Sequence, residues 1–130
     1  MQAQYRAHLS LLGIALILTV SGCAFGPTFR GSIQPLSNSD IVVVRAVAHR
    51  KSNGIQIDGD VLRTNGYATR IVGHLHIVGL DAHDNVVAET GAPWGEFMNR
   101  RFRLAYFRAI LKSADTSAII SIRIEPVIAP

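Results

Sequence analysis

The sequence predicts an all-β fold, a small antiparallel β-sandwich of about six to seven strands. From residue 40 onward, short segments alternate apolar and polar side chains with a period of two, as strands with one buried face do. Clusters of Gly, Asn, Asp and Ser separate these segments at the short intervals typical of sandwiches and barrels. Residues 40–130 are enough for one domain, so we expect a single sandwich there.

The first two strands are expected to form a hairpin across residues 41–63. In the first strand, the face predicted to be buried carries four apolar residues, Val42, Val44, Ala46 and Ala48. Its opposite face carries Arg45 and His49. Residues 51–54 form a turn signal. In the second strand, the predicted inward side chains are Ile55, Ile57, Gly59 and Val61.

The longest strand candidate spans residues 68–80 and alternates throughout. Leu75 and Ile77 lie on one face, with His74 and His76 on the other. A turn at residues 81–85 and a short return strand follow. Trp94 then stands in a Gly/Pro-rich loop, where a lone tryptophan more often closes the end of a sandwich than binds a ligand.

The segment 100–112 fits a helix or a strand imperfectly, because neither periodicity separates its arginines from its apolar residues. A turn at 113–116 and clean alternation over 118–125, with Ile120, Ile122 and Ile124 on one face, favour a final hairpin. We expect Pro126 to end the regular structure. By fold-level analogy, the pattern resembles immunoglobulin- or transthyretin-like sandwiches.

The chain begins with a short polar stretch that carries Arg6 and no acidic residue, followed by the apolar run Leu9–Val20. This run has the length of a signal h-region, whereas a membrane-spanning helix needs about 20 residues. It closes in Val20-Ser21-Gly22-Cys23, which resembles the lipobox of bacterial lipoproteins. The resemblance implies that residues 1–22 are a helical signal peptide and that Cys23 is lipidated. An ordinary secretory signal and an uncleaved transmembrane helix are the alternatives.

The lipoprotein resemblance also implies a location. Ala24 stands where an aspartate tends to retain Gram-negative lipoproteins at the inner membrane, so the resemblance implies an outer-membrane lipid anchor, with palmitate-type acyl chains and a domain facing the periplasm. Residues 23–39 are rich in Gly, Pro and Ser, and we expect a lipidated N terminus and flexible tether there. The tether's apolar residues either dock on the domain, dip into the membrane interface or are incidental, namely Phe25, Phe29, Ile33 and Leu36.

Composition limits the possible functions. The formal charge is +4, and loss of Arg6 with the leader lowers it to +3, which does not indicate a nucleic-acid binder. A mildly basic protein suits anionic lipids or envelope polymers, though weakly. Cys23 is the only cysteine, so no disulfide can form within the chain, and lipidation would account for the odd thiol.

The sequence contains no GxSxG, HExxH, CxxC or phosphate-binding glycine loop, and we therefore expect a protein that is not an enzyme. An envelope enzyme would need a deep pocket that the sequence does not reveal. His74 and His76, two apart on one strand, could share copper or zinc, with His49 or His83 as further ligands. The alternative is that both histidines are half-exposed residues without a metal. Calcium at Asp58, Asp60, Asp81 and Asp84 is weaker still, because the EF-hand pattern is absent.

Four arginines are concentrated in one segment, Arg100, Arg101, Arg103 and Arg108. They could contact phosphates of lipid or lipopolysaccharide, or acidic groups of a partner, because a guanidinium binds oxyanions bidentately. Solvated arginines flanking a strand are the plainer interpretation. Together these observations predict a lipid-anchored binding or scaffolding protein of the cell envelope. A metal-binding envelope protein is the alternative, and docking of a partner strand at a sheet edge is also possible.

Overall fold

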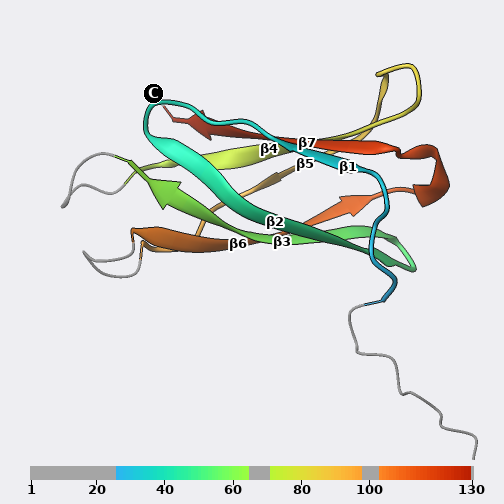
Figure 1. Cartoon of the computed structure of the whole chain (residues 1–130), viewed down its shortest axis with the longest axis horizontal. Coiled ribbons are helices and arrows are strands. Elements are labelled where there is room, and N and C mark those ends of the chain that lie inside the picture. The colour runs from blue at the N-terminus through green and yellow to red at the C-terminus, as the bar shows by residue number, and fades with distance from the viewer. Residues whose placement is uncertain (1–25, 65–70, 98–102, 130) are drawn as a thin grey trace, which may run out of the picture.

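The structure, a computed structural model, describes residues 26–64, 71–97 and 103–129. These residues form two packed sheets (Figure 1). The elements in chain order are β1 (Ser32–Pro35), β2 (Ile41–Lys51), β3 (Gly54–Arg63), β4 (Gly73–Leu80), β5 (Val86–Ala92), β6 (Leu104–Lys112), the short 3₁₀ helix η1 (Thr116–Ala118) and β7 (Ser121–Ile128). The predicted β-sandwich is confirmed, and its immunoglobulin- or transthyretin-like character stays a prediction.

One sheet has three strands in the order β2-β3-β6, with both neighbouring pairs antiparallel. In β6, four inward side chains, Ala105, Phe107, Ala109 and Leu111, are buried and alternate with exposed ones. The ambiguous segment is therefore a strand from Leu104 onward. The alternation predicted for β3 is also confirmed, with its apolar residues inward and Gln56, Asp58 and Asp60 outward.

The other sheet has four strands in the order β1-β7-β4-β5. Its pairs are antiparallel except that β1 runs parallel to β7. Large side chains from both sheets, among them Ile57, Phe107, Ile77 and Ile124, meet in one buried core. At the end of this core, the buried Trp94 indole donates a hydrogen bond to the Ile71 carbonyl oxygen at 3.2 Å. This placement agrees with the predicted role of Trp94 in closing the sandwich.

The prediction of which side chains face the core at the start of β2 was wrong. Ile41 and Val43 are buried, whereas Val44 is exposed. The register between β2 and β3 shifts between Val43 and Arg45, so Val44 is the extra residue of a β-bulge. Because a one-residue insertion reverses the side-chain parity, Ala48 still points inward as predicted.

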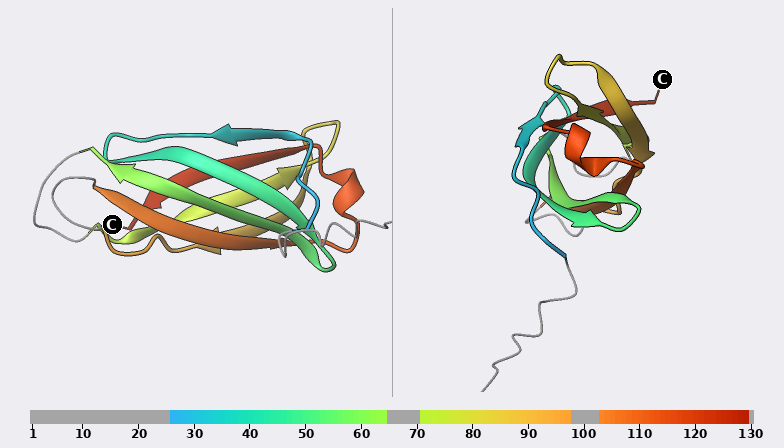
Figure 2. Two further views of the ribbon diagram at one scale, coloured as in Figure 1. Left: turned by 60° about the horizontal axis from the view of Figure 1, so that its bottom comes forward. Right: turned by 90° about the vertical axis from the view of Figure 1, so that its right-hand side faces the viewer.

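The predicted tether is largely part of the domain. Phe29 is buried, and its amide donates to the Ala48 carbonyl oxygen at 2.9 Å. The segment bridges to β2 at residues 28 and 37, and between these points β1 pairs with β7. It therefore joins the two sheets along one side of the sandwich, because it hydrogen-bonds to a strand of each (Figure 2). Docking of Phe29 on the domain was one of the alternatives, and composition alone did not select it.

Two predicted boundaries also differ. The strand predicted from residue 68 begins at Gly73, and residues 65–70 lie outside the described part. The last strand starts after the exposed Ile120 and continues through Pro126. Pro126 is tolerated because β1 no longer pairs with β7 there, and its carbonyl oxygen accepts a hydrogen bond from the Asn38 side chain at 3.3 Å on that open side.

The predicted signal peptide, residues 1–22, and the predicted lipidation site Cys23 lie outside the described residues. Within residues 26–64, 71–97 and 103–129, no helix is long and apolar enough to cross a membrane.

Candidate functional site

The outer face of the three-stranded sheet carries the densest polar network of the described residues. Strand register builds it, because Asp58 of β3 lies directly opposite Arg108 of β6, and Asp60 lies opposite Tyr106. These side chains point away from the core because their neighbours Ile57 and Phe107 point into it. The network is therefore a product of the β3–β6 pairing, which joins residues about 50 positions apart in the sequence.

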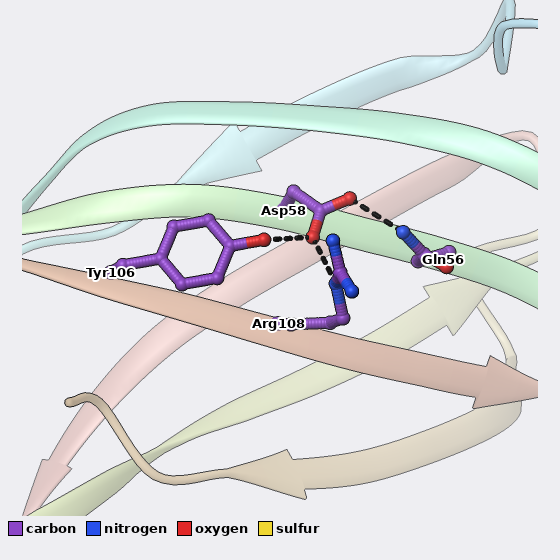
Figure 3. A network of polar contacts seen from close by, with 4 residues as sticks. All are labelled: Gln56, Asp58, Tyr106 and Arg108. Carbon is purple, nitrogen blue, oxygen red and sulfur yellow. Dashed lines mark hydrogen bonds and ion pairs between the residues drawn. The ribbon is translucent and has the colours of Figure 1, made fainter. Parts of the chain in front are cut away.

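Asp58 is the centre of this network (Figure 3). Its Oδ1 atom accepts hydrogen bonds from the Tyr106 hydroxyl and from Arg108 Nε, the latter at 2.6 Å. Its Oδ2 atom accepts from Gln56 Nε2 at 2.8 Å. The Arg108 guanidinium also lies 5.9 Å from the Tyr106 ring centroid, within the range of a cation–π contact. All four side chains thus hold one another in place on the sheet surface.

The hydrogen bonds of the network fix the protonation states of Asp58 and Tyr106 at neutral pH. Partial burial raises the pKa of Asp58, but the hydrogen bonds from Tyr106, Arg108 and Gln56 outweigh it and lower that pKa to about 2. The hydrogen bond to Asp58 raises the pKa of the Tyr106 hydroxyl. At neutral pH the carboxylate is therefore ionised and the phenol neutral. Neither group has a pKa near 7, where general acid–base catalysis is efficient.

Beside this network, the same face presents a second ion pair and exposed apolar side chains. Arg45 Nε lies 2.8 Å from Asp60 Oδ2. Val44 and Ile110 are exposed, as is Tyr106 with 49% of its surface accessible. Aromatic, arginine and apolar groups held on a rigid sheet are the composition of protein-binding surfaces. We name this surface, formed by Val44, Arg45, Tyr106, Arg108 and Ile110, the β2-β3-β6 face.

The structure does not bring the three predicted histidine ligands together. His74 and His76 extend from the outer face of β4, as predicted, and a His76 ring nitrogen lies 3.2 Å from Glu89 Oε2. His49 belongs to β2 in the opposite sheet, and packed sheets lie about 10 Å apart, so it cannot join them. Within the described residues, no group of three or more His, Cys, Asp or Glu side chains could hold a metal ion.

The acidic residues considered for calcium are also separated. Asp58 and Asp60 are engaged by arginines on the outer face of β3. Asp81 lies in the turn between β4 and β5, where its carboxylate accepts from the backbone amides of His83 and Asn85 at 2.8 and 2.9 Å. These contacts agree with the plainer interpretation, in which strand and turn geometry account for the acids.

The proposed arginine cluster is only partly described, because Arg100 and Arg101 lie outside the described residues. Arg103 precedes β6 and donates to the Thr64 carbonyl oxygen at 3.2 Å. Arg108 lies five residues further along, about 16 Å at the rise of a strand, and is paired with Asp58. Arg103 and Arg108 are therefore not brought together as one anion site.

Tyr106 and Gln56 were not singled out from the sequence. Their role depends on which residues of β3 and β6 lie opposite each other, and neither strand's own pattern specifies this register. The sequence did indicate that Asp58 in one strand, and Tyr106 and Arg108 in the other, occupy alternate positions whose side chains point outward. Pairing these two segments would have placed one acid between a tyrosine and an arginine.

No family model matches the chain, and no curated protein or solved structure is significantly similar to it.

Proposed function

We propose that the protein is an exported lipoprotein, anchored in the outer membrane through acylated Cys23, with a non-enzymatic binding or scaffolding role in the cell envelope. The observation that carries the proposal is the apolar run Leu9–Val20 closed by the lipobox-like tetrapeptide that ends in Cys23. A single acyl chain holds a protein only weakly, whereas two or three give stable attachment.

An anchor at Cys23 would precede both sheets in the chain, since β1 begins at Ser32, and would leave the outer sheet faces available to partners.

The β2-β3-β6 face supports the binding part of the proposal. Its ion pairs are mutually satisfied, so it offers a rigid surface, and its exposed Val44, Tyr106 and Ile110 offer apolar area for contact. Rigid aromatic and arginine side chains lose little conformational freedom on binding. We therefore assign partner contact to this face.

The anchor is tested by the intact mass of the membrane-extracted protein, with Cys23→Ala as the control. The proposal expects a chain that starts at residue 23 and carries the added mass of a diacylglycerol and an acyl group, and an unmodified chain for the variant. Retention of residues 1–22 in the wild-type protein would refute lipidation.

The binding face is tested by a photo-crosslinking residue placed in cells at Ile110, with Val127 on the outer face of the other sheet as the matched position. Both side chains are exposed on strands, so neither substitution disturbs the core. We expect a crosslinked species of one defined mass at Ile110 and none at Val127. Equal crosslinking at both positions would contradict the assignment of the face.

A further inference from the structure

The N-terminal segment docks at one pole of the sandwich. The amide of Arg50, at the end of β2, donates to the Pro27 carbonyl oxygen at 2.8 Å. The Arg50 side chain donates to the Thr116 hydroxyl at 3.3 Å and lies 5.7 Å from the Phe29 ring centroid, so it ties the segment to η1. The described chain therefore begins beside the turn between β2 and β3, as Figure 2 shows.

Basic side chains gather at this pole. Lys51 ends β2 and Lys112 ends β6. Both pair with Gly54 at the start of the central strand β3, so the two lysines lie on either side of this strand at one end of the sheet. They are the only two lysines in the chain. The exposed Arg30 follows Phe29 in the docked segment, and Arg50 adds a fourth cation. We name Arg30, Arg50, Lys51 and Lys112 the basic rim.

Chain length places the basic rim close to the proposed anchor. Between Cys23 and Pro27 there are four residue steps, which span at most about 14 Å when fully extended. A long tether would have let the sandwich move away from the membrane, but docking from Pro27 onward removes that freedom. The surface potential of anionic lipids acts over about 8 Å at physiological salt, and the rim enters this range when the link is shorter than its full extension.

We propose that the basic rim contacts the anionic phospholipid headgroups of the membrane in which the protein is anchored, and so fixes the orientation of the sandwich. This inference rests on the proposed lipidation of Cys23. Arginine and lysine suit it because their cations are drawn to phosphates, each increasing membrane contact by on the order of fivefold. The opposite pole, with Trp94 and Glu96, then points away from the membrane.

The acids at the same pole predict a tilt. Asp115 caps η1 close to Arg50, and its carboxylate accepts from the Ser117 amide at 3.0 Å. Asp81 and Asp84 lie in the turn between β4 and β5, at the other side of the pole from the turn between β2 and β3 (Figure 2). Anionic headgroups repel these carboxylates, so the β2–β3 turn lies nearer to the lipid than the β4–β5 turn.

The orientation is tested with the acylated mature protein in vesicles whose lipids carry a headgroup fluorescence quencher. In that form the Cys23 thiol is alkylated, so one introduced cysteine takes the fluorophore. The positions are Asn53→Cys near the basic rim, His83→Cys in the β4–β5 turn and Glu96→Cys at the far pole, all exposed. We expect strong quenching at 53, less at 83 and none at 96. Equal quenching at 53 and 96 would overturn the proposal.

Charge is tested by the vesicle composition and by a matched pair of variants. Quenching at position 53 should be stronger in an equal mixture of phosphatidylcholine and phosphatidylglycerol than in phosphatidylcholine alone, and salt should weaken it. Arg30→Gln with Lys112→Gln should reduce the contact equilibrium by about tenfold or more. Arg103→Gln with Arg123→Gln removes the same charge at two positions outside the basic rim and should leave the contact equilibrium unchanged. An equal loss of quenching in the two double variants would refute contact between the basic rim and the lipid.

Failure of the anchor is recognised separately. A protein whose mass shows no acyl groups, or that does not float with the vesicles, refutes the proposed lipidation before any quenching is measured. A protein that floats with vesicles but shows no preference for position 53 refutes only the basic rim.

Discussion

Replacement of Phe29 by alanine measures how far the N-terminal segment belongs to the folded domain. The Phe29 side chain is 5% exposed, and its ring lies so close to Gly31 that a Cβ there would approach the ring carbon Cζ to 2.3 Å. Truncation of a buried phenylalanine costs about 3–5 kcal/mol of unfolding free energy. Because Phe29 sits at the side of the core, where water can reach the vacated space, we expect about 3 kcal/mol.

The assay is urea unfolding of the chain from residue 24 onward, followed by far-UV circular dichroism. The free energy should fall through a lower midpoint at an unchanged m-value. Leu36→Ala is the control, because Leu36 lies in the same segment but is 40% exposed, and it should cost less than about 1 kcal/mol. A loss below about 0.5 kcal/mol for Phe29→Ala would show that residues 27–37 are not part of the cooperative unit, and would refute the short tether.

Three further outcomes test the core and the polar network. The pKa of Asp58 is about 2 in the folded protein and ordinarily 3.8, so its ionised carboxylate stabilises the fold above about pH 4, and this stabilisation is lost as the pH falls towards 2. Asp58→Asn should therefore lower the free energy of unfolding by about 1–2 kcal/mol at pH 7 and flatten the pH dependence of unfolding between pH 4 and 2. An equally steep acid limb in the variant would contradict the network. Gly59→Ala would place a Cβ 2.1 Å from the Arg45 carbonyl oxygen and 2.7 Å from the Phe107 ring, so thermal unfolding should show a loss of about 1–3 kcal/mol or more. Trp94 is the only tryptophan, so its emission should be blue-shifted and should shift to the red together with the circular dichroism transition; a red-shifted native emission would contradict its burial.

Most strands were predictable because alternation and turn composition are local signals, but the final hairpin predicted over 100–125 was wrong, because β6 and β7 lie in different sheets. Alternation in β3 assigned inward and outward residues correctly, and a turn composition separated it from β2. The bulge at Val44 was not predictable, because the four successive apolar residues 41–44 could alternate inward and outward in either of two ways. Register choice there depends on the pairing with β3, which no single-strand pattern contains.

The candidate site was predictable only in part for the same reason. The outward direction of Asp58 followed from alternation, but its ion pair with Arg108 follows from pairing across about 50 residues. The three histidines predicted as metal ligands are not brought together, for a related reason. His49 and His74 share outward parity, yet they lie in different sheets, and parity says nothing about which sheet a strand joins.

The N-terminal segment shows why composition misled. Gly, Pro and Ser indicate a chain without a core-facing period, and residues 26–39 indeed have none. A segment can nevertheless dock through its backbone, as when Leu36 donates its amide to the Ile124 carbonyl oxygen at 2.8 Å, and through one apolar side chain such as Phe29. This docking changes the functional argument, since a flexible tether of 16 residues would average roughly 20–25 Å and leave the domain's orientation open. If Cys23 is lipidated as proposed, a link of four residue steps from Cys23 to Pro27 makes orientation at the membrane a property of the fold itself.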